Sequence, residues 1–138
     1  LGYYTKYMFE KGHDIVGIDG NPNTTEITDG LCKVTDVTTM LTEYQSEWAL
    51  CLEVGEHIPA QYENIFFNNL NNIAVKGIIL SWAKPGQAGD GHVNCKPNKY
   101  VIEKLNFFGF KYDKNISERL RRVSTLGWFK DTIMVFER

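Results

Sequence analysis

Three acidic residues each end an apolar run that is typical of a buried β-strand. Asp19 ends the run 14–19, Asp36 ends the run 31–36, and Glu53 ends a run that begins at Trp48. Because the carboxyl ends of parallel strands share one edge of a sheet, we expect the three carboxylates to line one crevice. An acid at such an edge can accept hydrogen bonds from both hydroxyls of a nucleotide ribose. The pattern predicts a shared ligand site, although a single acid at a strand end is also typical of a turn.

Two further sets of reactive side chains follow. One lies directly after the third run, and the other lies in a glycine-rich loop at 83–96. Glu56 and His57 have the chemistry of an acid–base pair or of metal ligands, and His57 also suits a helix start that shapes a pocket. In the loop, His92 is a candidate base for an attacking nitrogen or oxygen nucleophile. The alternative is a polar surface loop with an anchoring tryptophan. The loop predicts an acceptor-binding segment whose stacking and hydrogen-bonding groups are Trp82, Gln87 and Asn94.

The elements that must position these residues alternate along the chain. Helical spacing or composition predicts helices over 3–11, 24–29, 60–73, 98–108 and 116–125. Apolar runs predict strands over 14–19, 31–36, 48–53, 75–82, 110–113 and 132–137. Alternation indicates one α/β domain over 1–138, with a mostly parallel sheet covered by helices on both faces. The two strands near the end of the chain predict that 132–137 runs antiparallel.

The chain begins with Leu1-Gly2, then a helical pattern, then the strand that ends at Asp19. The order glycine, helix, strand, acid is that of the second half of a nucleotide-binding βαβ unit. Together with the segment Leu52-Glu53-Val54-Gly55-Glu56-His57-Ile58-Pro59, it resembles the class I S-adenosylmethionine-dependent methyltransferases. That segment looks like the family's stretch after its fourth strand, often Glu-x-x-Glu-His-(Ile/Leu), and is the most specific motif of the set.

The resemblance implies a cofactor and a role for each matching residue. S-adenosylmethionine is the implied cofactor, and Gly2 resembles the last glycine of the family's Gly-x-Gly loop. Asp19, followed by Gly20 and Asn21, matches the acid that holds the ribose. Asp36 and Val37 match the segment that holds the adenine. Glu53 and Val54 match the segment that lines the methionine end of the cofactor. The implied fold is a three-layer, Rossmann-like sandwich. The implied activity is methyl transfer to a small-molecule or protein acceptor, with Glu56, His57 and His92 as the candidate catalytic residues.

In that family a central first strand precedes the glycine motif, and this sequence begins at Leu1. We therefore expect a fold that lacks this strand, binds the cofactor weakly or not at all, and self-associates through unpaired sheet edges. Two alternatives remain open. One is a catalytically inactive module that holds a partner or nucleotide. The other is a nicotinamide-dependent Rossmann enzyme, which shares the glycine turn and the ribose acid.

Composition limits the partners. The net charge of −2 gives no basic field for nucleic acid, so we expect none. The longest apolar runs are too short to cross a bilayer. Three cysteines, Cys32, Cys51 and Cys95, fit neither a zinc pattern nor a closed disulfide framework. We predict reduced thiols, a cytoplasmic protein and no metal cofactor.

Overall fold

The computed structural model describes residues 2–138, which form two compact units. One ends at Val37, and the other is Thr38–Arg138. Each unit is described by itself below. The expectation that 1–138 acts as one domain therefore stays a prediction.

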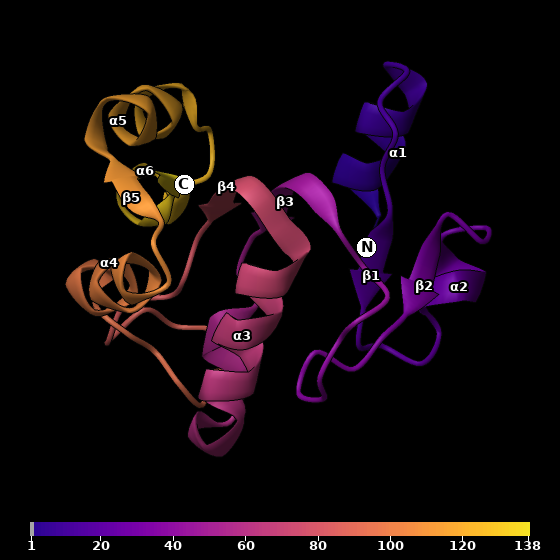
Figure 1. The fold of residues 1–138 in the computed structure, drawn as a ribbon, viewed down its shortest axis with the longest axis horizontal. Helices are drawn as coiled ribbons and strands as arrows, with labels where there is room; N and C mark the ends of the chain where they lie inside the picture. Colours follow the sequence, from indigo (N-terminus) through magenta and orange to yellow (C-terminus); the bar gives the residue numbers. More distant parts are fainter. Residues whose placement is uncertain (1) are drawn as a thin grey trace. The chain divides into compact units, whose positions relative to one another are not determined.

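The first unit contains a two-stranded parallel sheet (Figure 1). Its strands pair with Gly17 opposite Cys32 and Asp19 opposite Val34. A Cβ atom on Gly17 would lie 2.4 Å from Cys32 Sγ and 2.6 Å from Thr5 Oγ1, so a glycine is required where the helix packs on the strand. The predicted order is confirmed with shorter elements: α1 (Tyr3–Glu10), β1 (Gly17–Asp19), α2 (Thr24–Ile27) and β2 (Cys32–Val34).

The second unit holds a four-stranded sheet in the order β3-β4-β6-β5 (Figure 1). Strands β3 and β4 are parallel, and β6 is antiparallel to both β4 and β5. The predicted direction of the last strand is thus confirmed. The strands are β3 (Ser46–Cys51), β4 (Ala74–Leu80), β5 (Lys111–Asp113) and β6 (Met134–Glu137), and the helices are α3 (Glu63–Ile73), α4 (Asn98–Phe107), α5 (Lys114–Val123) and α6 (Phe129–Thr132).

The expectation of one mostly parallel sheet is wrong in one respect, because residues 2–138 form two separate sheets. The larger sheet is mixed, as the predicted antiparallel last strand implies. The physical reason for the mixing is the position of β6, which inserts between β4 and β5 and so makes two antiparallel ladders. The fold is α/β, as predicted, and the three-layer arrangement stays a prediction.

An aromatic cluster anchors the long loop that follows β4. Trp82 is fully buried, and its ring stacks on Phe67 with centroids 5.4 Å apart. A Cβ atom on Gly55 would lie 2.3 Å from the Trp82 ring, so this glycine lets the backbone lie flat against it. The indole N–H donates to the carbonyl oxygen of Asn94 at 2.8 Å. The predicted loop at 83–96 is confirmed and is held at both ends by the core of its unit.

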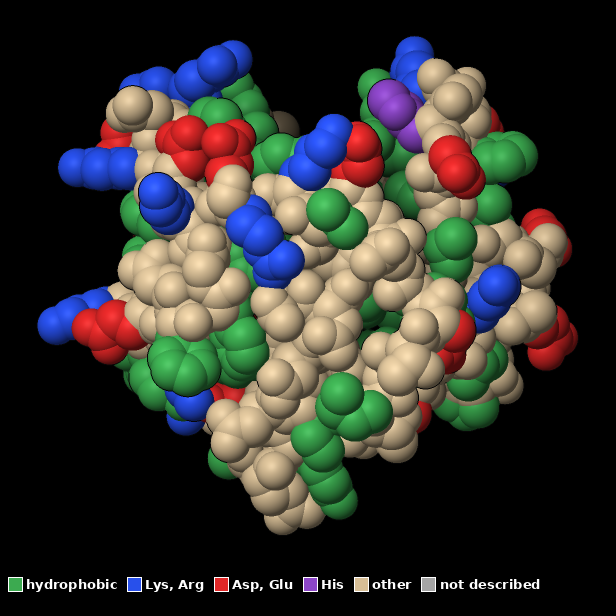
Figure 2. All heavy atoms as spheres, viewed as in Figure 1, with side chains coloured by type: hydrophobic (Ala, Val, Ile, Leu, Met, Phe, Trp, Pro, Cys, Tyr) green, Lys and Arg blue, Asp and Glu red, His purple; other side chains and the backbone are tan. Residues whose placement is uncertain are grey.

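The surface agrees with the charge balance of the sequence. Basic and acidic side chains are interspersed on the face drawn in Figure 2. In the described part of the chain, no helix is both long and apolar enough to cross a membrane. All three cysteines are free thiols, with Cys32 buried. The expectations about nucleic acid and localisation remain predictions.

We expect the chain to self-associate in solution, with a second copy as the partner. Within residues 2–138, α1 has no buried residue, and Tyr3, Tyr7 and Phe9 are 82%, 59% and 61% exposed. Strand β3 lies at a sheet edge. Apolar faces and open strand edges of this kind favour association between copies. Light scattering should give a mass above 15.8 kDa that rises with concentration.

The double variant Tyr7→Lys, Phe9→Lys is the matched test, because it places two positive charges on exposed positions of α1 and replaces no buried residue. It should shift the mass toward that of a monomer. A wild-type chain that stays monomeric at every concentration would contradict the expectation.

Candidate functional site

The second unit brings Glu53 to the carboxyl edge of β3 and β4. Cys51 pairs with Leu80 at the last register position of the two parallel strands, and the Ser81 amide donates to the Cys51 carbonyl oxygen at 3.1 Å. The Glu53 amide then donates to Ser81 Oγ at 2.9 Å. Glu53 has a φ of 52°, a left-handed conformation that non-glycine residues rarely adopt. Backbone strain of this kind clusters at functional sites, which makes Glu53 a candidate site residue.

The loop after β4 returns to this edge and contacts Glu53. Gln87 Nε2 donates to Glu53 Oε2 at 2.9 Å. The amides of Val93 and Asn94 both donate to the main-chain carbonyl oxygen of Glu56 at 2.9 Å. These bonds position the loop over the short 3₁₀ turn Gly55–His57. The segment after β3 and the loop after β4 therefore meet at this edge of the sheet.

Glu56 is the most unusual group in the site. Its side chain is fully buried, and neither carboxyl oxygen accepts a well-aligned hydrogen bond from a described residue. Burial raises the pKa of Glu56 to about 7, and the neighbouring Glu53 carboxyl group adds to the rise, while weak hydrogen bonds from the backbone amides of Glu56 and Ala83 oppose it. Burial, with a smaller contribution from Glu56, also raises the pKa of the adjacent Cys51 thiol to about 12, which keeps that thiol protonated.

Two histidines face this carboxyl group. His92 is 12% exposed, and its Nε2 atom lies 4.0 Å from Glu56 Oε1. The rings of His57 and His92 meet edge to face with centroids 5.1 Å apart. His92 Nδ1 lies 3.1 Å from the Gln87 carbonyl oxygen, and His57 Nδ1 lies 3.1 Å from that of Gly91.

These contacts determine which ring nitrogens are free to react. A carbonyl oxygen only accepts hydrogen bonds, so Nδ1 of each histidine must carry the proton that it donates. In the neutral rings the lone pairs of His57 and His92 are therefore on Nε2. A histidine lone pair next to a buried carboxyl group can accept a proton or bind a metal ion.

The other predicted members of the loop are more deeply placed. Trp82 stacks on Phe67 and not on an open cavity, and Asn94 is buried, with Nδ2 donating to Glu63 Oε2 at 2.9 Å. Both residues hold the loop to the core of the unit. Acceptor binding by Trp82, Gln87 and Asn94 stays a prediction.

Glu63 is a residue that the sequence analysis missed. It starts α3, is 5% exposed, and accepts hydrogen bonds from Asn94 and from the Tyr100 hydroxyl. Lys96 Nζ lies 3.5 Å from its Oε2, and Lys104 Nζ lies 3.9 Å from its Oε1. Burial acts to raise the pKa of Glu63, but the two hydrogen bonds and the two lysines outweigh it, so that the pKa is lowered. The ionised carboxylate thus joins α3, the loop and α4.

We expect Glu63→Gln to destabilise the chain by about 1–3 kcal/mol at neutral pH, because charged hydrogen bonds to buried groups are lost. A lowered pKa in the folded state means that this contribution is full above the unfolded value of about 4.3 and is lost as the pH falls through the folded value. Urea unfolding at neutral and at acidic pH checks both points. The exposed pair Lys99–Glu103 provides the control, and Glu103→Gln should cost less than about 1 kcal/mol. A pH-independent difference between wild type and Glu63→Gln would contradict the assignment.

The first unit positions the two remaining acids at the carboxyl edge of β1 and β2. Asp19 ends β1, and Asp36 follows β2 in an exposed loop. Asp19 Oδ1 accepts from the Asn21 amide at 2.8 Å and from Thr24 Oγ1 at 3.4 Å. Hydrogen bonds of this kind are typical of a turn. They also fix the Asp19 carboxylate at the end of β1.

The remaining predicted cofactor residues are described each in its own unit. Gly2 caps α1 with a φ of 75°, and a Cβ atom there would lie 2.8 Å from Thr28 Cγ2. Gly20 and Asn21 form the turn after β1, Val37 follows Asp36, and Val54 precedes the 3₁₀ turn of the second unit. A crevice shared by Asp19, Asp36 and Glu53 stays a prediction, because the two units are described separately.

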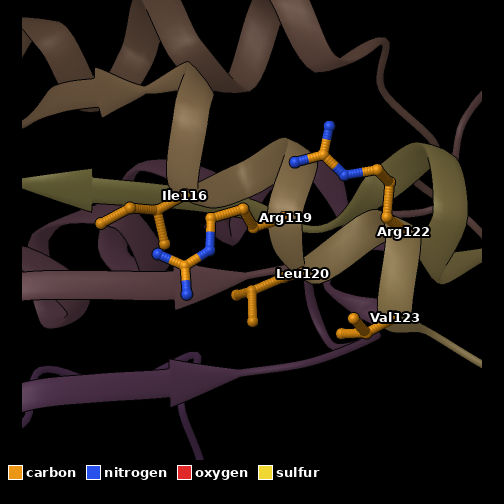
Figure 3. Close-up of a pocket in the computed structure, with 5 residues that line it drawn as sticks. All are labelled: Ile116, Arg119, Leu120, Arg122 and Val123. Atoms are coloured by element: carbon orange, nitrogen blue, oxygen red, sulfur yellow. The ribbon is translucent and has the colours of Figure 1, made fainter.

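A shallow depression of about 390 Å³ lies elsewhere, on α5. Figure 3 shows its lining side chains, which all come from this one helix: Ile116, Arg119, Leu120, Arg122 and Val123. It contains none of the predicted site residues, and a groove along a single helix offers no converging polar groups. We therefore place the candidate site at the strand ends.

The sequence matches no protein-family model, and a search of curated proteins finds no match. Among solved structures, the chain is similar to the 1,6-didemethyltoxoflavin-N1-methyltransferase of Burkholderia thailandensis, with a TM-score of 0.69 and 13% identity over 99% of this chain and 66% of that one. It is also similar to the magnesium protoporphyrin IX methyltransferase of Synechocystis PCC 6803, with a TM-score of 0.65 and 14% identity over 93% of this chain and 64% of that one. The methyltransferase domain of bacterial CtHen1 gives a TM-score of 0.64 and 12% identity over 98% of this chain and 83% of that one.

The chain spans less than two thirds of the first two of these structures, both of which contain bound S-adenosylhomocysteine. At such identities the likeness concerns the fold alone. Over nearly its whole length, this chain has the fold of S-adenosylmethionine-dependent methyltransferases.

Proposed function

We propose that this chain transfers a methyl group from S-adenosylmethionine to a nucleophilic acceptor. The observation that carries the proposal is the methyltransferase fold together with acids at the carboxyl ends of β1 and β3 and after β2. Strand ends are where open α/β sheets bind ligands. The comparisons support a cofactor of this class, since two of the similar structures contain its demethylated product.

In this proposal the first unit holds the nucleoside. Asp19 accepts hydrogen bonds from the ribose hydroxyls through the carboxylate that its turn already fixes. Asp36 and Val37 hold the adenine, and Gly2 gives the methionine end a close approach to the start of α1. For Glu53 and Val54, the resemblance of their segment to the family's stretch after its fourth strand supports a role at the methionine end of the cofactor.

In the same proposal the acceptor binds to the second unit. Methyl transfer is an in-line displacement at a sulfonium, so the protein mainly aligns the two reactants and excludes water. The attacking nitrogen or oxygen must lose a proton, and the Nε2 lone pair of His92 is placed to take it. Glu56 and His57 complete the wall around that nitrogen, and the loop carrying Gln87 covers the strand ends.

The test is transfer of a labelled methyl group. The chain is incubated with methyl-labelled S-adenosylmethionine and separate small-molecule and protein fractions of a cell extract, and label is followed into each fraction. Transfer that depends on the folded chain supports the proposal and also shows the acceptor class. Saturable cofactor binding without any transfer would indicate an inactive binding module instead.

A further inference from the structure

Three side chains of metal-ligand type meet at the candidate site. Ligand atoms of Glu56, His57 and His92 all lie within 4.8 Å of one another. On a tetrahedral ion with bonds of about 2.1 Å, neighbouring ligand atoms lie about 3.4 Å apart. His92 Nε2 and Glu56 Oε1 are 4.0 Å apart, so side-chain rotations that bring these atoms closer would complete the set.

Glu56 gives an independent reason to expect a ligand. It is completely buried, and within residues 2–138 neither of its carboxyl oxygens accepts a well-aligned hydrogen bond. Glu53 Oε1, beside it, is a third buried oxygen in the same condition. Buried polar groups without partners cost free energy, and folded proteins rarely keep them. Oxygens from two neighbouring carboxyl groups would be compensated by a cation.

The histidines are held as metal-binding histidines are. Metal-bound imidazoles usually donate the N–H of the other ring nitrogen to a carbonyl oxygen or a carboxylate, which fixes the ring and its tautomer. His57 and His92 both make this contact through Nδ1, to the carbonyl oxygens of Gly91 and Gln87. Two Nε2 lone pairs are thereby left to bind an ion.

A glycine keeps one of these nitrogens accessible. A Cβ atom on Gly89 would lie 2.2 Å from His92 Nε2, so any side chain at this position would collide with that atom. Because Gly89 has no positive φ, the need for glycine here comes from the close approach and not from the backbone conformation.

We propose that Glu56, His57 and His92 bind a divalent transition-metal ion, with Glu53 beside them. Two imidazoles with a carboxylate favour ions such as Zn²⁺, Mn²⁺, Fe²⁺ or Co²⁺ over Mg²⁺ and Ca²⁺, which prefer oxygen ligands. The proposal goes beyond methyl transfer and replaces the expectation of no metal cofactor. While the ion is bound, the Nε2 lone pair of His92 cannot also act as a base.

The test uses the whole chain, stripped of metal and without cofactor. Calorimetry with Zn²⁺ should show one ion per chain, and Co²⁺ should give visible absorption bands of a bound ion, whereas Mg²⁺ at the same concentration should not bind. His57→Ala removes an exposed ligand without opening the core, and it should weaken Zn²⁺ binding by more than about tenfold, since even outer partners of metal ligands are worth that much.

Gly89→Ala tests the same site without removing a ligand. Its new methyl group would press on His92 Nε2, and it should also weaken Zn²⁺ binding. His13→Ala is the control, because His13 lies in the first unit and belongs to no part of the group. A folded wild type that binds neither Zn²⁺ nor Co²⁺ would overturn the proposal, as would unchanged binding by His57→Ala. Because the metal titration contains no S-adenosylmethionine, its outcome does not depend on whether the chain transfers methyl groups.

Discussion

The variant His92→Ala should lose about 10²- to 10⁴-fold in the rate of methyl transfer, the range expected when a positioned proton acceptor is removed. The cofactor affinity should stay close to that of the wild type, because His92 is assigned to the acceptor and not to the nucleoside. The labelled-methyl assay at saturating S-adenosylmethionine measures the first quantity, and a titration with S-adenosylhomocysteine measures the second. The loss is expected whether Nε2 of His92 accepts a proton or holds an ion.

His13→Ala is the matched control, since this exposed histidine lies in the other unit. It should transfer methyl groups at the wild-type rate. Equal rates for His92→Ala and the wild type would remove the loop after β4 from the chemistry. A parallel loss of cofactor affinity would instead indicate that the variant disturbs the fold.

The variant Asp19→Ala should weaken the binding of S-adenosylhomocysteine by about 1–3 kcal/mol, the value of hydrogen bonds to a charged group. This corresponds to an increase of about 5- to 150-fold in the dissociation constant. The reason is the loss of the acceptor for the ribose hydroxyls at the end of β1. Calorimetry or an NMR titration at equal protein concentration checks it.

Asp14→Ala is the control for charge, because Asp14 is an exposed acid shortly before β1. It should leave the affinity unchanged. An unchanged affinity for Asp19→Ala, with the sheet of the first unit intact by NMR, would show that Asp19 only forms the turn through the Asn21 amide.

Most of the fold could be predicted because its elements are locally encoded. Apolar runs ending in an acid located β1, β2 and β3, and helical spacing located α3 and α4. The helix α6 was missed, because a four-residue helix carries too little periodicity to be recognised. The split into two sheets and the position of β6 between β4 and β5 depend on pairing between distant strands, which no local pattern specifies.

The candidate site could likewise be predicted only in part. Residue type alone indicated Glu56, His57 and His92, but their meeting depends on how the loop after β4 folds back over the 3₁₀ turn. In the sequence, Gly89 stood out only as one glycine of a glycine-rich loop. Its close approach to His92 is visible only in the structure. Trp82 was selected for its stacking face, and the structure places that face on Phe67 inside the core. Glu63 gave no signal, since an acid at a helix start is common.

The central claim, that the chain is built to bind S-adenosylmethionine at these strand ends, is tested most directly by NMR. The amide spectrum of the isotope-labelled chain is followed during a titration with S-adenosylhomocysteine, a method that also maps weak binding. Methyl transfer by this chain requires binding, even if it is weak, whereas the sequence alone left the absence of binding open. We therefore expect saturable shifts that centre on the amides around Gly2, Asp19 and Asp36 and that are lost in Asp19→Ala. A folded chain that shows no saturable shifts, or shifts confined to other regions, would contradict it.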